Sequence, residues 1–97
     1  MSLHRRAAKR DANERGIVEA LRAAGASIAH LSGKGVPDLL ISFHGRFWLA
    51  EVKQKKGKLT SDQVKWHANM RGQILILRTV DDALALIQGG TGDDALR

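Results

Sequence analysis

Two acidic residues and a lysine near the middle of the chain have the types and spacing needed for phosphodiester chemistry. Asp38 follows Pro37, and Glu51 and Lys53 come after a short hydrophobic hairpin. Carboxylate oxygens suit Mg²⁺ or Mn²⁺, and a bound cation polarises a phosphate and lowers the pKa of a bound water. A neighbouring lysine orients that water, deprotonates it when its amine is neutral, or as an ammonium stabilises the charge that builds on phosphorus. The trio therefore predicts a hydrolytic site.

A hairpin would bring the three side chains together. Side chains alternate along a strand, so Glu51 and Lys53 point the same way, with Cα atoms about 7 Å apart. The start of the first hairpin strand lies beside the end of the second, so we expect Asp38 near both. The strand face expected to carry the site holds Phe47, Leu49, Glu51 and Lys53, with Trp48, Ala50 and Val52 on the opposite face.

Each part of this pattern has an ordinary structural interpretation. A Glu-x-Lys on a strand is usually a solvent-facing ion pair, and Pro-Asp before a strand is common turn chemistry. Three features favour a site: the hairpin spacing, the apolar Leu49 on the Glu51 face, and the basic loop that follows Lys53.

The elements expected to position these residues follow the order helix, three strands, helix, strand, helix. Thr60 and Gln63 match a capping box at the start of the second helix. The continuous apolar run 74–77 suits a strand buried on both faces. The predicted ranges are helix 7–24, strands 27–31, 38–43 and 46–53, a helix from Thr60 to about Arg71, strand 73–78, and a helix from Thr79 to about Gln88.

Size and composition limit the class of protein. A chain of 97 residues forms one domain that buries only about two-thirds of its unfolded surface, so a dimer partner would stabilise it. The absence of cysteine excludes disulfides and thiolate zinc sites and fits a cytoplasmic protein. We expect a single domain over 1–97, with a flexible basic arm at 1–6 and a flexible tail at 89–97.

The net charge of +6 comes with clustered basic residues, which favour a nucleic-acid partner over a merely solvated surface. No apolar run approaches the roughly 20 residues of a membrane span. The residues expected to contact DNA are Arg5, Arg6, Lys9, Arg10, Lys34, Lys55, Lys56 and Lys58.

Three segments together resemble the VRR-NUC branch of the PD-(D/E)XK nucleases, which is akin to Holliday junction resolvases. They are Pro37-Asp38, Glu51-Val52-Lys53, and Leu59-Thr60 with Gln63. The resemblance covers roughly residues 13–77. It implies an α/β, restriction-endonuclease-like fold: an α-β-β-β-α-β core with a mixed central sheet flanked by helices, plus a short C-terminal helix.

The resemblance also implies a role for each matching residue. Asp38, Glu51 and the Val52 carbonyl would bind Mg²⁺ or Mn²⁺, and Lys53 would be the catalytic lysine. Gln63 would line the site and orient water, phosphate or Lys53. The capping box already explains Gln63, and one side-chain amide is not expected to fill both roles.

A glutamate of the first helix often completes the metal site in this family. Glu14 shares the apolar face with Ile17 and Leu21, whereas Glu19 lies about 140° further around the helix. We therefore predict Glu14 as a metal ligand, with an ordinary surface acid as the alternative. His67 lies one turn after Gln63 on the same face, where a packed or surface histidine is the simpler interpretation.

The sequence thus predicts a metal-dependent endonuclease that cuts DNA, preferentially branched DNA or four-way junctions. The resemblance implies 5′-phosphate and 3′-hydroxyl products. A homodimer would supply two sites. Alternatives within the class are a nicking or general duplex nuclease, and outside it a non-catalytic basic DNA-binding module or a protein–protein adaptor. A small basic nuclease suits a phage or mobile element, acting in the cytoplasm of a bacterial or phage-infected cell.

Overall fold

The computed structural model describes residues 11–89, which form a four-stranded sheet and three helices. The order of elements agrees with the order that the sequence predicts. The elements are α2 (Glu14–Ala23), β1 (Ser27–His30), β2 (Leu39–Phe43), β3 (Arg46–Val52), α3 (Ser61–Asn69), β4 (Ile74–Leu77) and α4 (Val80–Gly89).

The sheet is mixed, with strand order β1-β2-β3-β4. The first three strands are antiparallel neighbours, and β4 pairs with β3 in parallel. His44 and Gly45 close the β2–β3 hairpin with φ angles of 51° and 78°. Two positive φ values in a two-residue loop match the right-handed twist of the flanking strands, which explains the tight turn.

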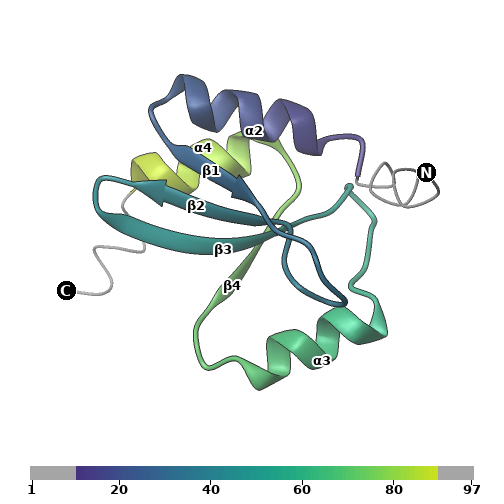
Figure 1. The fold of residues 1–97 in the computed structure, drawn as a ribbon. Coiled ribbons are helices and arrows are strands. Elements are labelled where there is room, and N and C mark those ends of the chain that lie inside the picture. Colours follow the sequence, from purple (N-terminus) through teal and green to yellow (C-terminus); the bar gives the residue numbers. More distant parts are fainter. Residues whose placement is uncertain (1–10, 90–97) are drawn as a thin grey trace, which may run out of the picture.

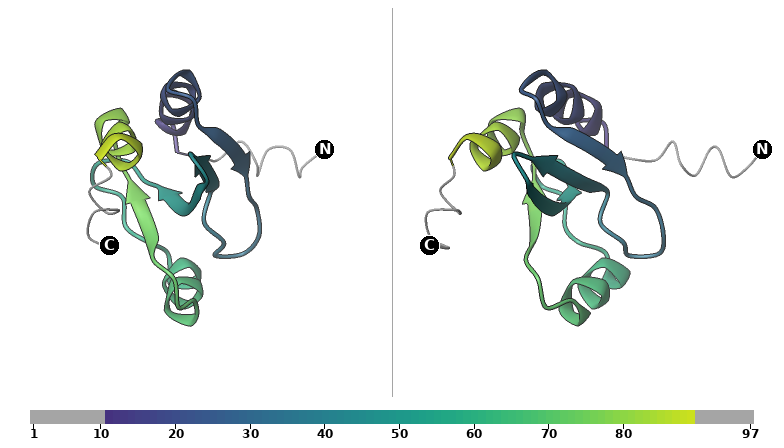
Figure 2. Two further views of the ribbon diagram at one scale, coloured as in Figure 1. Left: turned by 90° about the vertical axis from the view of Figure 1, so that its left-hand side faces the viewer. Right: turned by 60° about the vertical axis from the view of Figure 1, so that its left-hand side comes forward.

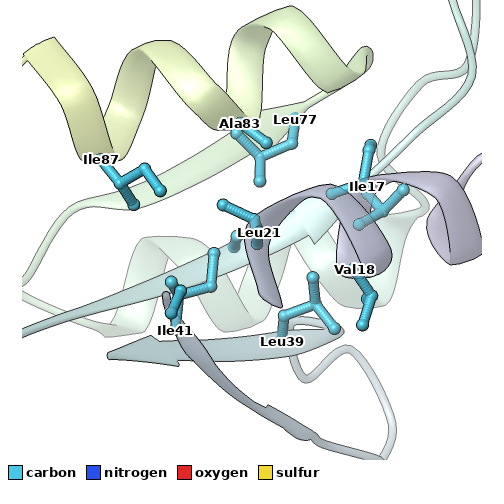
Figure 3. Packing of buried hydrophobic residues seen from close by; sticks show 11 residues of the cluster. Ile17, Val18, Leu21, Leu39, Ile41, Leu77, Ala83 and Ile87 are labelled. Carbon is cyan, nitrogen blue, oxygen red and sulfur yellow. The ribbon is translucent and has the colours of Figure 1, made fainter. Parts of the chain in front are cut away.

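The helices lie on both sides of this sheet. Helices α2 and α4 lie together on one side, and α3 stands on the other side, beyond the start of β4 (Figures 1 and 2). The hydrophobic core fills the space between the sheet and the α2–α4 pair (Figure 3). Its fully or almost fully buried members include Ile17, Val18, Leu21, Leu39, Ile41, Ala50, Val52, Leu77, Ala83 and Ile87.

Helix α2 buries the face that the sequence pattern predicts, with Glu14, Ile17, Val18 and Leu21 all inaccessible. Gly25, with φ 105°, follows its C-cap and ends the helix as expected. The predicted start is wrong within the described residues. Residues 11–13 form a turn in which the Glu14 N–H donates to the Asp11 carbonyl, and residues 7–10 lie outside the described range.

One further boundary and one burial pattern differ from prediction. Helix α3 ends at Asn69 rather than near Arg71, because Met70 takes an extended conformation (φ −98°, ψ 139°). The strand β4 is not buried on both faces, and Ile76 is 38% exposed. Among the described strands β4 lies at the sheet edge, so it has a neighbouring strand on one side only. Within residues 11–89, no helix has the length and apolar character required to cross a membrane.

Candidate active site

Asp38 and Glu51 meet at the open end of the β2–β3 hairpin, as strand pairing predicts. Asp38 directly precedes β2, and its Oδ2 accepts a hydrogen bond from the Val52 N–H at 2.8 Å. The Asp38 side chain also hydrogen-bonds to Glu51. The two carboxyl groups and the Val52 backbone therefore form one cluster.

Glu51 is a strongly perturbed acid. Its side chain is 1% exposed. Burial, and after it the hydrogen bond and negative charge of Asp38, raise its pKa from 4.5 to about 8, while Lys53 acts in the opposite direction. Glu51 therefore tends to hold its proton near neutral pH.

Gln63 connects helix α3 to this carboxyl pair. Its Nε2 donates to Glu51 Oε2 at 2.8 Å, and its Oε1 accepts from the Thr60 N–H at 2.8 Å. The Thr60 side chain completes the predicted capping box by accepting from the Gln63 N–H. One amide thus makes both contacts, because its oxygen caps the helix while its nitrogen reaches Glu51. That Gln63 also orients water, phosphate or Lys53 stays a prediction.

The loop before β2 also holds α3 in place. Gly35 has φ 76°, and a Cβ atom there would clash with the Asp62 carbonyl in the first turn of α3. Only glycine allows this close approach without strain. The loop that delivers Asp38 and the helix that delivers Gln63 are thus packed against each other.

The backbone of Lys53 is fixed from two directions. Its N–H donates to the Leu77 carbonyl at 3.0 Å, and its carbonyl accepts from Asn13 Nδ2 at 3.0 Å. Asn13 also donates to the Arg78 carbonyl at 2.7 Å, so it ties the N-terminus of α2 to the ends of β3 and β4. The Lys53 ammonium lies close enough to Glu51 to lower its pKa.

The basic loop after Lys53 is organised by Arg78. Arg78 Nη1 donates to the carbonyls of Gln54 at 2.7 Å, Lys55 at 3.2 Å and Gly57 at 2.9 Å. Three converging carbonyls fix the curvature of the loop and leave its lysines exposed. Sequence reasoning missed Arg78, whose only signal is a basic residue at the end of the last strand.

The two glutamates of α2 lie in different environments. Glu14 is 5% exposed, and its Oε2 lies 3.1 Å from His30 Nδ1 of β1. Glu19 is exposed and pairs with Arg15 at 3.1 Å. Burial agrees with the choice of Glu14, and whether Glu14 binds a metal stays a prediction.

Two residues near Glu51 were missed or set aside from the sequence. The negative charge of Asp11 raises the Glu51 pKa, and Asp11 Oδ2 is buried. His67 Nε2 lies 4.0 Å from Glu51 Oε1, and the His67 side chain is 16% exposed. The one-turn spacing from Gln63 was the signal for His67, whereas Asp11 was hidden inside the predicted helix.

The predicted DNA-contacting residues divide into two groups. Lys34, Lys55, Lys56 and Lys58 are exposed in loops, where phosphates can reach them. The other four, Arg5, Arg6, Lys9 and Arg10, lie outside the described residues.

The donor set fits a hard divalent cation. Glu51 Oε1 is buried without a hydrogen-bond partner in the described chain, and Glu51 lies next to a second carboxyl group, that of Asp38. Within residues 11–89 no three His, Asp or Glu side chains form a ready ligand cluster. Mg²⁺ commonly uses one or two carboxylates and keeps several waters, so Asp38, Glu51 and the Val52 carbonyl would suffice.

Comparison with known proteins supports the same architecture. Neither a protein-family model nor a curated protein matches the sequence. A solved structure described as a "VRR_NUC domain" superposes with a TM-score of 0.64 at 23% sequence identity, covering 80% of this chain and 97% of the other. The protein therefore has a VRR-NUC-type, restriction-endonuclease-like fold.

Proposed function

We propose that this protein is a metal-dependent endonuclease that hydrolyses DNA phosphodiester bonds. The observation that carries the proposal is the pairing of half-buried Asp38 with buried Glu51, beside Lys53. A paired carboxyl group whose pKa is about 8 is costly to keep ionised without a cation. A purely structural strand end does not require such a carboxyl pair, whereas a metal site does. The fold shared with the VRR_NUC domain structure is consistent with this interpretation.

Each residue of the site has a separate proposed role. Asp38, Glu51 and the Val52 carbonyl would hold Mg²⁺ or Mn²⁺, which supplies a polarised phosphate and an acidified water. Lys53 orients that water or stabilises the negative charge that develops on the phosphate oxygens. Gln63 fixes the orientation of Glu51 through its hydrogen bond to Oε2.

The basic loop supplies the contact with the DNA backbone. Lys55, Lys56 and Lys58 follow Lys53 directly and are exposed, so phosphates bound to them would lie next to the carboxyl pair. Contacts of this kind recognise the shape of DNA rather than its sequence. We therefore propose selectivity for branched DNA, with four-way junctions as the leading substrate.

Cutting both strands requires two sites, which a twofold homodimer would provide. The sheet face opposite α2 and α4 offers apolar surface for such a contact. Phe47 is 68% exposed there and borders a depression lined also by Leu40, Leu49 and Gln73. We expect light scattering to show a dimer for the wild type and a monomer for Phe47→Ser. A monomeric wild type, with and without DNA, would contradict the dimer.

Cleavage of labelled DNA tests the function directly. A panel of four-way junction, flap, nicked duplex and plain duplex is incubated with Mg²⁺ or Mn²⁺ and with chelator. We expect cutting only with metal, a loss of at least about 100-fold in Lys53→Ala, and retention in Lys65→Ala, which removes an exposed lysine of α3. Equal cutting by wild type and Lys53→Ala would overturn the mechanism, and equal cutting of all four DNAs would overturn the selectivity.

The rival function is a non-catalytic DNA-binding module, favoured by the ordered basic loop alone. That function predicts binding that weakens steeply with salt, does not depend on metal, and leads to no cleavage. The metal and chelator arms of the same experiment separate the two.

A further inference from the structure

Two buried polar atoms face each other beside the carboxyl pair. His67 Nε2 and Glu51 Oε1 lie 4.0 Å apart, and neither has a hydrogen-bond partner within residues 11–89. The separation is too long for a direct hydrogen bond. Buried nitrogen and oxygen atoms without partners are unusual in folded proteins, so this pair requires an explanation.

The position of His67 is determined by the same helix that delivers Gln63. The two residues are one turn apart on α3, so their side chains project from the same face. The Gln63 amide nitrogen donates a hydrogen bond to Glu51 Oε2. His67 therefore faces the other oxygen of Glu51, which remains available to a ligand.

We propose that His67 Nε2 is a nitrogen ligand of the divalent cation, beside Glu51 Oε1. This inference rests on the proposed metal-dependent function and adds a residue that the VRR-NUC resemblance did not assign. Two atoms bonded to one ion at about 2.1 Å lie about 3.0 Å apart at a right angle and about 4.2 Å apart when opposite. The observed 4.0 Å falls between these limits.

A nitrogen ligand changes which cation the site prefers. Mg²⁺ favours oxygen donors, whereas imidazole suits first-row transition ions. His67 therefore biases the site toward Mn²⁺ over Mg²⁺. A site built only from Asp38, Glu51, the Val52 carbonyl and water has no such bias.

Pulsed electron paramagnetic resonance of bound Mn²⁺ tests the bond without relying on activity. The full-length protein is loaded with Mn²⁺ in two forms, one unlabelled and one grown with ¹⁵N-histidine. We expect an imidazole ¹⁴N coupling that the ¹⁵N label replaces. Bound Mn²⁺ without a histidine coupling would overturn the inference and leave the nuclease proposal intact. Failure to bind Mn²⁺ at all would overturn both.

Substitutions identify which histidine is responsible. His67→Gln and His67→Phe should abolish the coupling and weaken Mn²⁺ binding by about tenfold or more, with less than about threefold change for Mg²⁺. His44→Asn is the matched control, because His44 is exposed in the hairpin turn at φ 51°, a conformation that asparagine tolerates. A coupling that persists in both His67 variants, or equal losses for Mn²⁺ and Mg²⁺, would contradict the assignment.

Discussion

The side chain of Gln63 links the N-terminus of α3 to Glu51 through one amide group. Its nitrogen donates to Glu51 Oε2 and its oxygen accepts from the Thr60 N–H, each at 2.8 Å. Helix α3 has no fully buried residue, so hydrophobic packing alone does not fix its position. The hydrogen bond to Glu51 therefore positions the helix and the carboxyl group together.

The two functions of Gln63 are separable by substitution. Gln63→Glu keeps an oxygen for the capping box but replaces the donor to Glu51 with a second acceptor. We expect this variant to keep its helix cap and to lose about tenfold or more in cleavage rate, because Glu51 loses its orienting partner. Steady-state cleavage of junction DNA with Mn²⁺ measures the effect.

Thr60→Ala is the matched control for the cap. It removes the hydroxyl that accepts from the Gln63 N–H and should cost about 1 kcal/mol in the free energy of unfolding, measured with urea. We expect its cleavage rate at saturating metal to stay near that of the wild type. A Gln63→Glu variant that cuts as fast as wild type would show that the hydrogen bond to Glu51 is only structural.

The raised pKa of Glu51 predicts how stability depends on pH in the absence of metal. Its pKa is about 8 in the folded protein against 4.5 ordinarily, so the folded protein holds this proton more tightly than the unfolded chain. The free energy of unfolding contributed by Glu51 is therefore highest below pH 4.5 and decreases as the pH rises to about 8.

Glu51→Gln isolates this contribution, because other titrating groups cancel between the two proteins. With chelator present, the variant should gain stability relative to wild type between pH 5 and pH 8, as urea midpoints would show. Adding Mn²⁺ at pH 8 should raise the stability of the wild-type protein but not that of Glu51→Gln. A stability difference that stays constant with pH would contradict the raised pKa.

Local patterns in the sequence were sufficient to predict the hairpin and the helix cap. Strand alternation and a two-residue turn determine where Asp38 and Glu51 meet, since both follow from the period and pairing of strands. The capping box at Thr60 depends only on residues within four positions. These parts of the site are local, so neighbouring residues determine them.

Contacts between distant segments were not predictable in the same way. Asn13 lies 40 residues from Lys53 and 65 from Arg78, yet its amide donates to both carbonyls. Its expected helical environment gave no indication of this role. Ile76 was expected to be buried because a continuous apolar run does not reveal whether its strand lies at a sheet edge.

The contacts of Arg78 predict that it acts on DNA binding through the basic loop. Arg78→Gln removes a charged donor from the carbonyls of Gln54, Lys55 and Gly57. Without it the loop gains freedom, and ordering its lysines on DNA costs entropy. We expect DNA affinity without metal to fall by about tenfold, as fluorescence anisotropy would measure.

Arg22→Gln controls for the loss of charge alone. Arg22 is exposed on α2, where its guanidinium makes a single contact of 3.4 Å with the Ile28 carbonyl. Arg22→Gln should lower the DNA affinity much less than Arg78→Gln does. Circular dichroism should show that both variants keep the folded structure. Equal losses in the two variants would show that Arg78 contributes only its charge.

Glu14 and Glu19 offer a paired test of the acid that the first helix supplies to the site. Glu14 is buried and contacts His30, whereas Glu19 is exposed and pairs with Arg15. Glu14→Gln preserves the size of the side chain and an oxygen that can still accept from His30 Nδ1. If Glu14 is a metal ligand, this variant should lower Mn²⁺ affinity by about tenfold or more in calorimetric titrations.

Glu19→Gln should leave Mn²⁺ affinity unchanged and alter stability by less than about 1 kcal/mol, because an exposed ion pair contributes little. The free energy of unfolding with chelator shows any structural effect of Glu14→Gln. A further loss of stability that appears only when Mn²⁺ is added shows an effect on metal binding. If Glu14→Gln leaves the Mn²⁺ affinity unchanged, the role of Glu14 is structural, namely to hold His30 and β1 in place. The carboxyl pair of Asp38 and Glu51 would then bind the cation without an acid from α2.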